Sequence, residues 1–261
     1  MLHETSPTPV VILAGGLGTR LREETEFKPK PMVAVGERPI IWHIMKHYSR
    51  YKYRKFIVCL GYKGEVIIDY FMNFQDTGAT VFVGAQKNRV QIEFSEPEKE
   101  DWDILLCDTG KDSLTGDRLI QIAKYIDTPY FLMTYGDGLS NVNIDSVVAF
   151  HHRSKSLATL TAVHPASRFG ALEIAESGIV NSFLEKPQSQ DWINGGFFVL
   201  NSSVLDKIQP GSFEDETLTI LAKNKKLSAF KHDGFWQCMD TYREYLELNG
   251  LWNRGNVPWL S

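Results

Sequence analysis

The chain reads PVVIL over residues 9–13 and AGGLGTR over residues 14–20. A continuous apolar run that ends in glycines is typical of a strand buried on both faces of a parallel sheet. The glycines after it allow successive backbone N–H groups to approach phosphate oxygens without obstruction by a Cβ atom. Ligands of open α/β sheets bind at the carboxyl ends of central strands. We therefore predict a central strand followed by an anion-binding turn; a glycine turn without a ligand is the alternative.

Strand and helix patterns alternate outward from this stretch, which predicts an α/β sheet with right-handed crossovers. Beyond residue 155 the pattern is richer in strands, so a mixed sheet is expected there. The predicted strands are 9–13, 55–60, 80–84, 90–94, 103–107, 130–134, 158–163, 171–174, 179–183, 196–200 and 227–232. The predicted helices are 39–50, 63–71, 117–126, 143–152, 203–208, 213–222 and 241–252. No linker or internal repeat divides the chain, so we predict one domain over residues 1–261.

Bulk composition excludes several classes of protein. The chain has 261 residues, 43% of them hydrophobic and 23% charged, with a formal net charge of -4. Such a balance argues against a disordered chain and against a protein that coats nucleic acid. The three cysteines lack zinc-binding spacing and are expected to be reduced thiols, and no apolar run approaches membrane length. We expect a cytoplasmic protein that binds no membrane, with residues 1–9 as a short mobile leader.

Lys30 lies between two prolines in the stretch KPKP at residues 28–31. Proline stiffens the backbone on either side, so the lysine side chain is aimed from an extended segment. The glycine turn lacks the spacing of a P-loop, and Leu21 stands where the dinucleotide fingerprint needs a small third residue. The combination of GGLGTR with a lysine in PKP instead resembles the signature of the sugar nucleotidyltransferase superfamily.

The resemblance extends over residues 10–259 and is greatest to the glucose-1-phosphate cytidylyltransferases. It is carried by the stretches CDTG at 107–110, TGDRL at 115–119, TYGDG at 134–138, RFGAL at 168–172, EKP at 185–187, WINGGFF at 192–198 and FWQCMDT at 235–241. It implies a Rossmann-like three-layer mixed sheet of the nucleotide-diphospho-sugar transferase type. A nucleotide-binding half over about 10–140, a sugar-binding half over about 141–261 and a homo-oligomer, with a hexamer possible, follow from the same resemblance.

The resemblance also implies roles for individual residues. Those expected to bind the nucleotide are Leu13, Ala14, Gly15, Gly16, Leu17, Gly18, Thr19, Arg20, Lys30, Ser113, Arg118 and Gly136, and those expected to act in catalysis are Arg20, Lys30 and Asp137. Gly170, Glu185, Lys186 and Asn194 would bind the sugar phosphate, and Asp137 with Asp240 would hold Mg²⁺. Asp240 has an alternative interpretation as a helix N-cap, and Ser113 and Arg118 as an exposed polar loop before a helix.

The activity that the resemblance implies is transfer of a cytidylyl group from CTP to glucose 1-phosphate. Local spacing cannot fix the base, so UTP, dTTP, ATP and GTP stay open as alternatives. Two further alternatives are a catalytically inactive regulatory subunit of the same fold and a glycosyltransferase, for which the spelling DWD at 101–103 would be the metal motif. Histidines 151, 152, 164 and 232 lack acids at ligand spacing and are expected to be structural.

Overall fold

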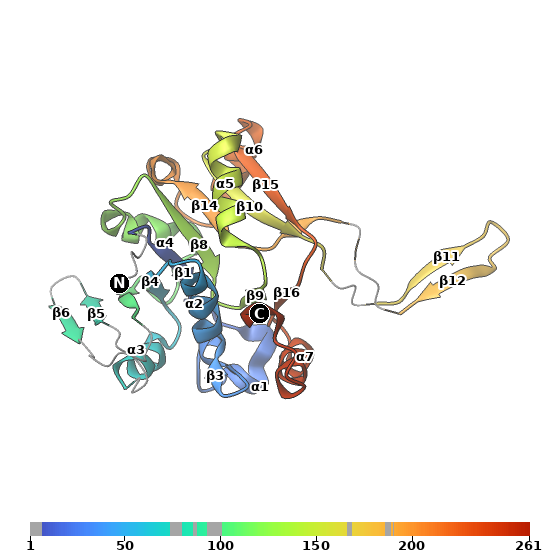
Figure 1. Ribbon diagram of the computed structural model, residues 1–261, viewed down its shortest axis with the longest axis horizontal. Coiled ribbons are helices and arrows are strands. Elements are labelled where there is room, and N and C mark those ends of the chain that lie inside the picture. Colours follow the sequence, from blue (N-terminus) through green and yellow to red (C-terminus); the bar gives the residue numbers. More distant parts are fainter. Residues whose placement is uncertain are drawn as a thin grey trace.

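The computed structural model describes residues 7–73, 80–85, 88–92, 101–165, 169–185, 189 and 191–261. Within these residues, a central sheet of ten strands crosses the body of the protein (Figure 1). Its strands are β1 Val10–Leu13, β4 Lys55–Leu60, β5 Thr80–Ala85, β6 Asn88–Ile92, β7 Asp103–Asp108, β8 Tyr130–Tyr135, β10 Ala158–Val163, β13 Ile193–Asn194, β14 Phe198–Asn201 and β15 Leu227–His232. The strand predicted over 90–94 runs from 88 to 92, and residues 93 and 94 lie outside the described residues.

The predicted central strand is confirmed. Strand β1 lies between β8 and β4 and is parallel to both, and β7 and β5 continue the parallel arrangement beyond β4. On the other side, β14 runs antiparallel to β8, and β10 pairs with β14 antiparallel and with β15 parallel. The sheet is therefore mixed, as expected for the second half of the chain, and it has a further antiparallel pair in the first half, where β6 pairs with β5.

Strand β1 contributes side chains to two hydrophobic cores. Val10 and Ile12 pack into one core, and Val11 and Leu13 pack into the other. The first core is covered by α2 Ile40–Arg50, α3 Gly64–Met72, α5 Ile144–Ser154 and α7 Tyr242–Asn253, and the second by α4 Thr115–Ile122 and α6 Thr219–Lys223. Because side chains alternate across a strand, this division confirms three layers, with the sheet in the middle.

Several elements differ from the prediction. The helix expected over 213–222 is a π-helical segment, Phe213–Leu218, followed by α6, and the helix expected over 203–208 is a 3₁₀ helix, Ser202–Lys207. Short elements that the periodicity did not indicate are α1 Arg22–Thr25, the ribbon β2 Ala34–Val35 with β3 Arg38–Pro39, and the ribbon β9 Gly138–Ser140 with β16 Trp236–Cys238. Further 3₁₀ turns cover Thr19–Leu21, Lys30–Met32, Ala123–Tyr125 and Pro258–Leu260.

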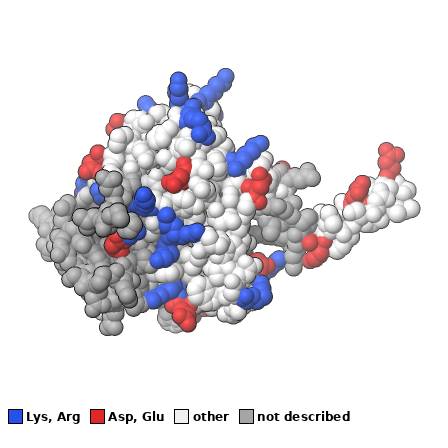
Figure 2. Space-filling view, viewed as in Figure 1, with Lys and Arg blue, Asp and Glu red and all other residues white. Residues whose placement is uncertain are grey.

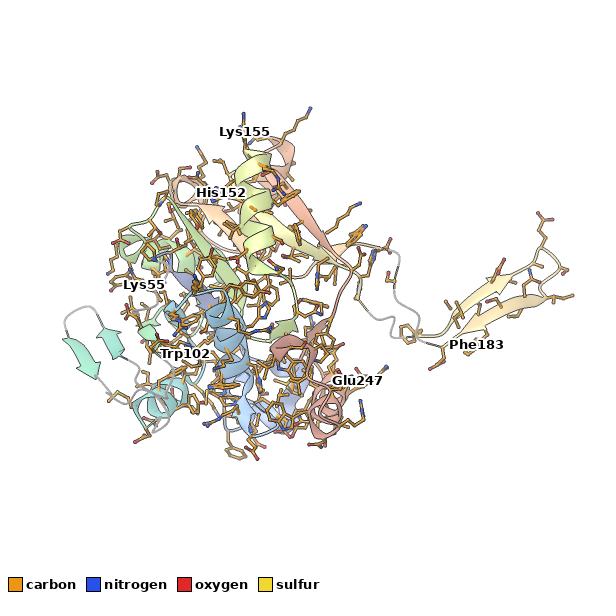
Figure 3. The ribbon with its side chains drawn as sticks, viewed as in Figure 1. Lys55, Trp102, His152, Lys155, Phe183 and Glu247 are labelled. Atoms are coloured by element: carbon orange, nitrogen blue, oxygen red, sulfur yellow. The ribbon has the colours of Figure 1, made fainter. Side chains whose placement is uncertain are left out.

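A two-stranded hairpin, which we call the arm, projects far from the body (Figure 1). It consists of β11 Ala171–Ile174 and β12 Val180–Leu184, paired antiparallel as a sheet of their own. Phe183 lies near its base (Figure 3), and the described part of the arm carries acidic but no basic side chains (Figure 2). Much of its surface is apolar, because Leu172, Ile174 and Val180 are each about half exposed or more.

None of the helices in the described ranges combines the length and the apolar character needed to cross a membrane. Cys59 and Cys107 are buried free thiols, and Cys238 is a half-buried free thiol. The cytoplasmic location stays a prediction. The mobile leader also stays a prediction, because residues 1–6 lie outside the described residues.

Candidate active site

A cleft of about 940 Å³ opens at the carboxyl ends of β1 and β8. Fifteen of the residues predicted from the sequence line it, namely Leu13, Ala14, Gly15, Gly16, Leu17, Gly18, Thr19, Arg20, Lys30, Ser113, Arg118, Gly136, Asp137, Asn194 and Asp240. Residues that are more than 200 positions apart in the chain therefore meet in one cavity. This is the strand edge at which the glycine turn predicted a ligand.

The glycine turn presents its amides to the cleft because its carbonyl groups are bound elsewhere. The carbonyl oxygen of Gly15 accepts hydrogen bonds from Tyr62 N at 3.3 Å and from the Arg118 guanidinium at 3.2 Å. Gly18 has φ of 62°, a left-handed conformation that favours glycine, and its carbonyl oxygen accepts from Leu21 N at 3.0 Å. Among the described residues, no hydrogen bond is donated by the amides of Gly15, Gly16 or Gly18. These donors are available to an anion.

Arg118 packs against the glycine turn and is hydrogen-bonded to it. Its guanidinium donates to Leu60 O at 2.7 Å and to Thr109 Oγ1 at 2.6 Å, in addition to Gly15 O. The side chain is 4% exposed, so its interpretation as part of an exposed polar loop is wrong. Ser113 is half-buried and donates its hydroxyl to Thr109 O. A Cβ atom at Gly15 would lie 2.2 Å from the guanidinium carbon, which explains the glycine there.

A compact group of two cations and two carboxylates lies beside the turn. Lys30 Nζ donates to Asp137 Oδ2 at 3.0 Å and to Asp240 Oδ1 at 2.7 Å, and Arg20 binds the other oxygen of Asp240. Burial lowers the pKa of Lys30, but the attraction of Asp137 and the hydrogen bond to Asp240 outweigh it and raise the pKa. Burial likewise opposes ionisation of Asp240, yet the bonds from Lys30 and Arg20 hold its pKa below the ordinary value. Both partners are therefore charged at neutral pH.

Asp240 does not cap the helix that follows it. Thr241 is the N-cap of α7, and its side chain accepts from the amide of Glu244, whose carboxylate in turn accepts from the amides of Thr241 and Asp240. This capping box satisfies the helix terminus without the Asp240 side chain. The N-cap interpretation of Asp240 is wrong, and its carboxylate faces the cleft instead.

The carboxylates of Asp137 and Asp240 fit a hard divalent cation. Their oxygens share one cationic neighbour, the Lys30 ammonium, so they already converge on a common position. In the part of the chain that the structure describes, no group of three or more His, Cys, Asp or Glu side chains could hold a metal on its own. Mg²⁺ commonly takes only one or two carboxylates together with phosphate oxygens and waters. The site therefore suits a metal that arrives with a phosphate ligand.

His151 and the DWD stretch lie apart from the group of cations and carboxylates. His151 is 4% exposed and hydrogen-bonded to Thr159, and burial lowers its pKa to about 4. Asp101 forms an ion pair with Arg54, and Trp102 is buried at the amino end of β7. Because β7 is parallel to β4 and β4 to β1, this end of β7 is opposite to the cleft. The geometry does not support a glycosyltransferase metal site there.

The predicted sugar-binding residues are not gathered in one place. Asn194 lines the cleft, whereas Gly170 and Glu185 lie together at the base of the arm, where a Cβ on Gly170 would be 3.3 Å from Glu185 Oε2. Neither Gly170 nor Glu185 lines the cleft of the same chain. Lys186 lies outside the described residues.

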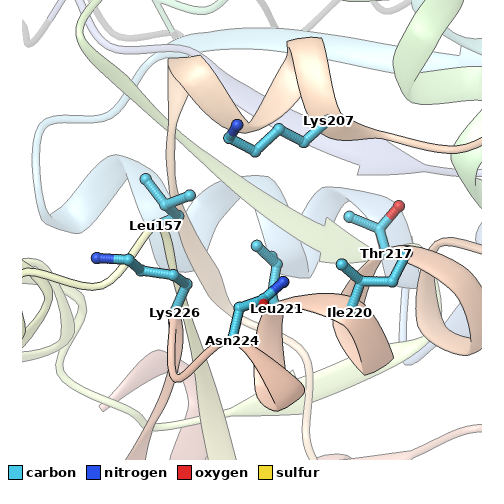
Figure 4. A pocket seen from close by; sticks show the side chains of 7 residues that line it. All are labelled: Leu157, Lys207, Thr217, Ile220, Leu221, Asn224 and Lys226. Atoms are coloured by element: carbon cyan, nitrogen blue, oxygen red, sulfur yellow. The ribbon is translucent and has the colours of Figure 1, made fainter.

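Sequence reasoning missed several residues that line the cleft, among them Thr115, Tyr135, Glu214, Trp236 and Cys238. Tyr135 ends β8 and precedes Asp137 by two positions, so its place at a strand terminus could have indicated it. Glu214 comes from the π-helical segment and carried no signal beyond its charge. A second, smaller cavity of about 250 Å³ contains none of the predicted residues (Figure 4). It is lined by Leu157, by Lys207 and Thr217 from the 3₁₀ and π-helical segments, and by Ile220, Leu221, Asn224 and Lys226 from α6 and the turn that follows it.

Comparison with known proteins agrees with this site. The family model described as "Nucleotidyl transferase" matches residues 9–252. The glucose-1-phosphate cytidylyltransferase of Salmonella typhi is 49% identical over 95% of this chain and 97% of its own length. The probable glucose-1-phosphate cytidylyltransferase of Bacillus subtilis is 42% identical over 95% of this chain and 98% of its own. The crystal structure of HddC from Yersinia pseudotuberculosis shares the fold with a TM-score of 0.66 at 24% identity, covering 94% of this chain and 99% of that one.

Proposed function

The chain belongs to the nucleotidyl transferase family, and we propose that it transfers a cytidylyl group from CTP to α-D-glucose 1-phosphate, giving CDP-glucose and pyrophosphate. The substrates are supported by the names of two relatives that match nearly the whole chain at 49% and 42% identity. In the site, the proposal depends on one observation: Lys30 joins Asp137 and Asp240 beside a turn whose amides are available. That arrangement suits phosphoryl chemistry on a metal-bound triphosphate.

The proposed reaction needs no general base. An oxygen of the sugar phosphate forms a bond to the α-phosphorus of CTP while the bond to the pyrophosphate oxygen breaks, and the attacking oxygen is already ionised. The protein must hold two polyanions in line and offset their charge. We assign the amides of Gly15, Gly16 and Gly18 to the triphosphate, and Arg20 and Lys30 to the phosphates and the charge that develops on them.

We propose that Asp137 and Asp240 would hold Mg²⁺. When bound, the ion would neutralise phosphate charge and help to orient the triphosphate. The Lys30 ammonium, held by both carboxylates, would keep them at the phosphate end of the cleft. Arg20, whose side chain is 72% exposed, can turn from Asp240 towards a phosphate at little cost.

For the sugar phosphate, we propose that Asn194 meets a hydroxyl from within the cleft, that Gly170 and Glu185 act from the base of the arm, and that Lys186 also takes part. Gly170 and Glu185 do not line the cleft of their own chain. They would reach a cleft if the arm folded back onto its own body, or if it entered the cleft of another copy. We therefore also propose a homo-oligomer in which the apolar face of the arm is covered, because an isolated two-stranded hairpin is at best marginally stable in water.

Pyrophosphate release tests the proposed activity. The purified protein is given Mg²⁺ and glucose 1-phosphate with each of CTP, UTP, dTTP, ATP and GTP in parallel. Release with CTP alone supports the proposal, and release with another triphosphate keeps the chemistry but changes the base. Silence with all five, while the protein still binds CTP and Mg²⁺, would favour an inactive regulatory subunit.

A further inference from the structure

Glu214 links two walls of the cleft through hydrogen bonds to Thr115 and Tyr135. Its Oε1 accepts from the Tyr135 hydroxyl at 2.7 Å, and its Oε2 accepts from Thr115 Oγ1 at 2.6 Å and from Ser212 Oγ at 3.2 Å. Thr115 begins α4 directly after residues 111–114, which line the cleft. Tyr135 ends β8 and contacts Asn194. One carboxylate thus contacts the walls on both sides.

The hydrogen bonds from Glu214 to Asn194 have a single possible direction. An ionised carboxylate can only accept, so the Tyr135 hydroxyl must donate to Glu214. The phenolic oxygen is then left as an acceptor, and Asn194 Nδ2 donates to it at 3.1 Å. At the other end of the same amide, Asn194 Oδ1 accepts from Gly196 N at 3.0 Å. Both ends of the Asn194 amide are therefore assigned by neighbours that cannot exchange roles.

A fixed amide presents a fixed pattern to a ligand. One Nδ2 hydrogen and one lone pair of Oδ1 remain beyond the two internal bonds, and Asn194 lines the cleft. A site that hydrogen-bonds a substrate hydroxyl discriminates strongly against an analogue that lacks it, provided that the protein group cannot reorient. The exposed Asn194 side chain is held by Tyr135, which is half-buried and is itself bonded to the half-buried Glu214.

We infer that Glu214 is a positioning residue that acts through Tyr135 to fix the Asn194 amide, and so sets the selectivity for a hydroxyl group of the sugar phosphate. The inference rests on the proposed function. Replacing Glu214 by glutamine keeps the shape but supplies an N–H donor towards Tyr135. The phenol would then lose the acceptor of its proton and its oxygen would accept from the glutamine, which weakens the bond from Asn194 and leaves the amide held by Gly196 N alone.

The test compares glucose 1-phosphate with its 2-, 3-, 4- and 6-deoxy analogues at saturating CTP and Mg²⁺. We expect the wild-type protein to discriminate against at least one analogue by about tenfold or more in kcat/KM, and Asn194→Ala to remove that discrimination. Glu214→Gln and Tyr135→Phe should each weaken discrimination against the same analogue by about tenfold, with KM for CTP changed less than about twofold. The double variant should be no worse than either single variant, because both break one chain of bonds.

Thr115→Val is the control, since it removes one hydrogen bond to Glu214, together with the acceptor of the Phe213 amide, but lies outside the chain of bonds from Glu214 to Asn194. It should leave the analogue discrimination unchanged. If Glu214→Gln and Tyr135→Phe fold and retain wild-type discrimination, or if Thr115→Val alters it equally, the positioning role is overturned while the proposed activity stands. A wild-type protein that is inactive with every triphosphate overturns the proposed activity and the positioning role together. Tyr135→Phe serves as the second variant if Glu214→Gln does not fold.

Discussion

In the group of two cations and two carboxylates that lines the cleft, the cations offset the repulsion between the carboxylates. Asp137 and Asp240 can lie side by side because the Lys30 ammonium is hydrogen-bonded to both. Removing that ammonium leaves two carboxylates facing each other and repelling the phosphates that they should receive with a metal. Lys30 is therefore expected to matter twice, once for the substrate and once for the carboxylates.

Lys30→Met preserves the length of the side chain and removes its charge. We expect kcat/KM for CTP to fall by on the order of 10²–10³-fold, because a charge aimed at the transferred phosphate is lost. Lys28→Met is the control in the same proline-flanked segment, since Lys28 is partly exposed and its ion-pair partner in the described part of the chain is Glu24 at 3.5 Å. Steady-state pyrophosphate release measures both variants, and equal, small losses would show that Lys30 has no special role.

Gly15 and Gly16 are expected to have different roles in the glycine turn. The first is required by packing, and the second is assigned to ligand binding. An alanine Cβ at Gly15 would lie 2.2 Å from the buried Arg118 guanidinium, whereas no atom of the described residues lies within 4 Å of one at Gly16. Gly15→Ala should displace Arg118 and lower the free energy of unfolding by on the order of 2 kcal/mol or more, because hydrogen bonds to Leu60 and Thr109 are lost. Urea unfolding measures this loss.

The companion variant Gly16→Ala should change the free energy of unfolding by less than about 1 kcal/mol. It should nevertheless weaken CTP binding in calorimetry, since we assign the Gly16 amide to the triphosphate and an added methyl group would stand in its way. A Gly16→Ala protein that binds CTP normally would argue against the assignment of this amide to the nucleotide.

At the scale of elements, helix α2 carries two buried histidines that stay neutral. His43 donates from Nε2 to Val35 O at 2.8 Å and accepts from Trp259 Nε1 at 3.2 Å, so no position is left for a second proton. His47 donates to Val142 O at 2.9 Å. Burial lowers the pKa of each to about 4.

This burial predicts a loss of stability in mild acid. Below pH 6.5 the unfolded chain binds a proton on each histidine and the folded chain does not, so the free energy of unfolding falls as the pH drops towards 4. Each histidine should remove on the order of 3 kcal/mol over that interval. Urea unfolding at several pH values measures the slope. His47→Gln keeps a donor for Val142 without titrating, and should make the slope shallower by about one proton; an unchanged slope would contradict the assignment.

The elements that the sequence predicted well are those whose pattern is local. Strands β4, β10, β11 and β15 have the predicted bounds, because each is a short run of β-forming residues between turn residues. The ribbon of β9 with β16 was missed because Gly138–Ser140 is too short to show a period and its partner lies about a hundred residues later. The π-helical turns of Phe213–Leu218 look helical in sequence. What this segment positions is seen from its bonds with Thr115, whose hydroxyl donates to Glu214 and accepts from the amide of Phe213.

The candidate site shows the same difference between local patterns, which could be predicted, and long-range contacts, which could not. The glycine turn, Lys30 and Asp137 have local signatures, whereas the convergence of Asp240 on Lys30 spans 210 positions and depended on family resemblance. Glu214 had neither a motif nor a period to indicate it. The position of Gly170 and Glu185 on a projecting arm was not predictable, since the sequence of β11 and β12 indicates a hairpin but not where it points.

At the scale of the whole molecule, the arm is the feature that one chain leaves unexplained. Directly opposed residues of β11 and β12 share a face: Leu172 pairs with Phe183, and Ile174 with Val180. These four side chains are 49–61% exposed, while Glu173 and Ser182 pair on the other face. A contiguous exposed apolar face on a hairpin without a third strand needs a cover, and we proposed another copy of the chain.

Replacing Leu172 and Ile174 together by lysine places two charges on that face without disturbing the body, because neither side chain packs into a core. We expect the mass measured by sedimentation to fall towards that of the 29.7 kDa chain, while the melting temperature of the body changes little. Lysines at Glu173 and Ser182, on the opposite face, are the matched control and should leave the assembly intact. If the arm also supplies Gly170 and Glu185 to a cleft in a second copy, the dispersed protein should lose sugar-phosphate turnover yet still bind CTP. A wild-type protein that sediments as a single chain would show that the arm must fold back on its own body.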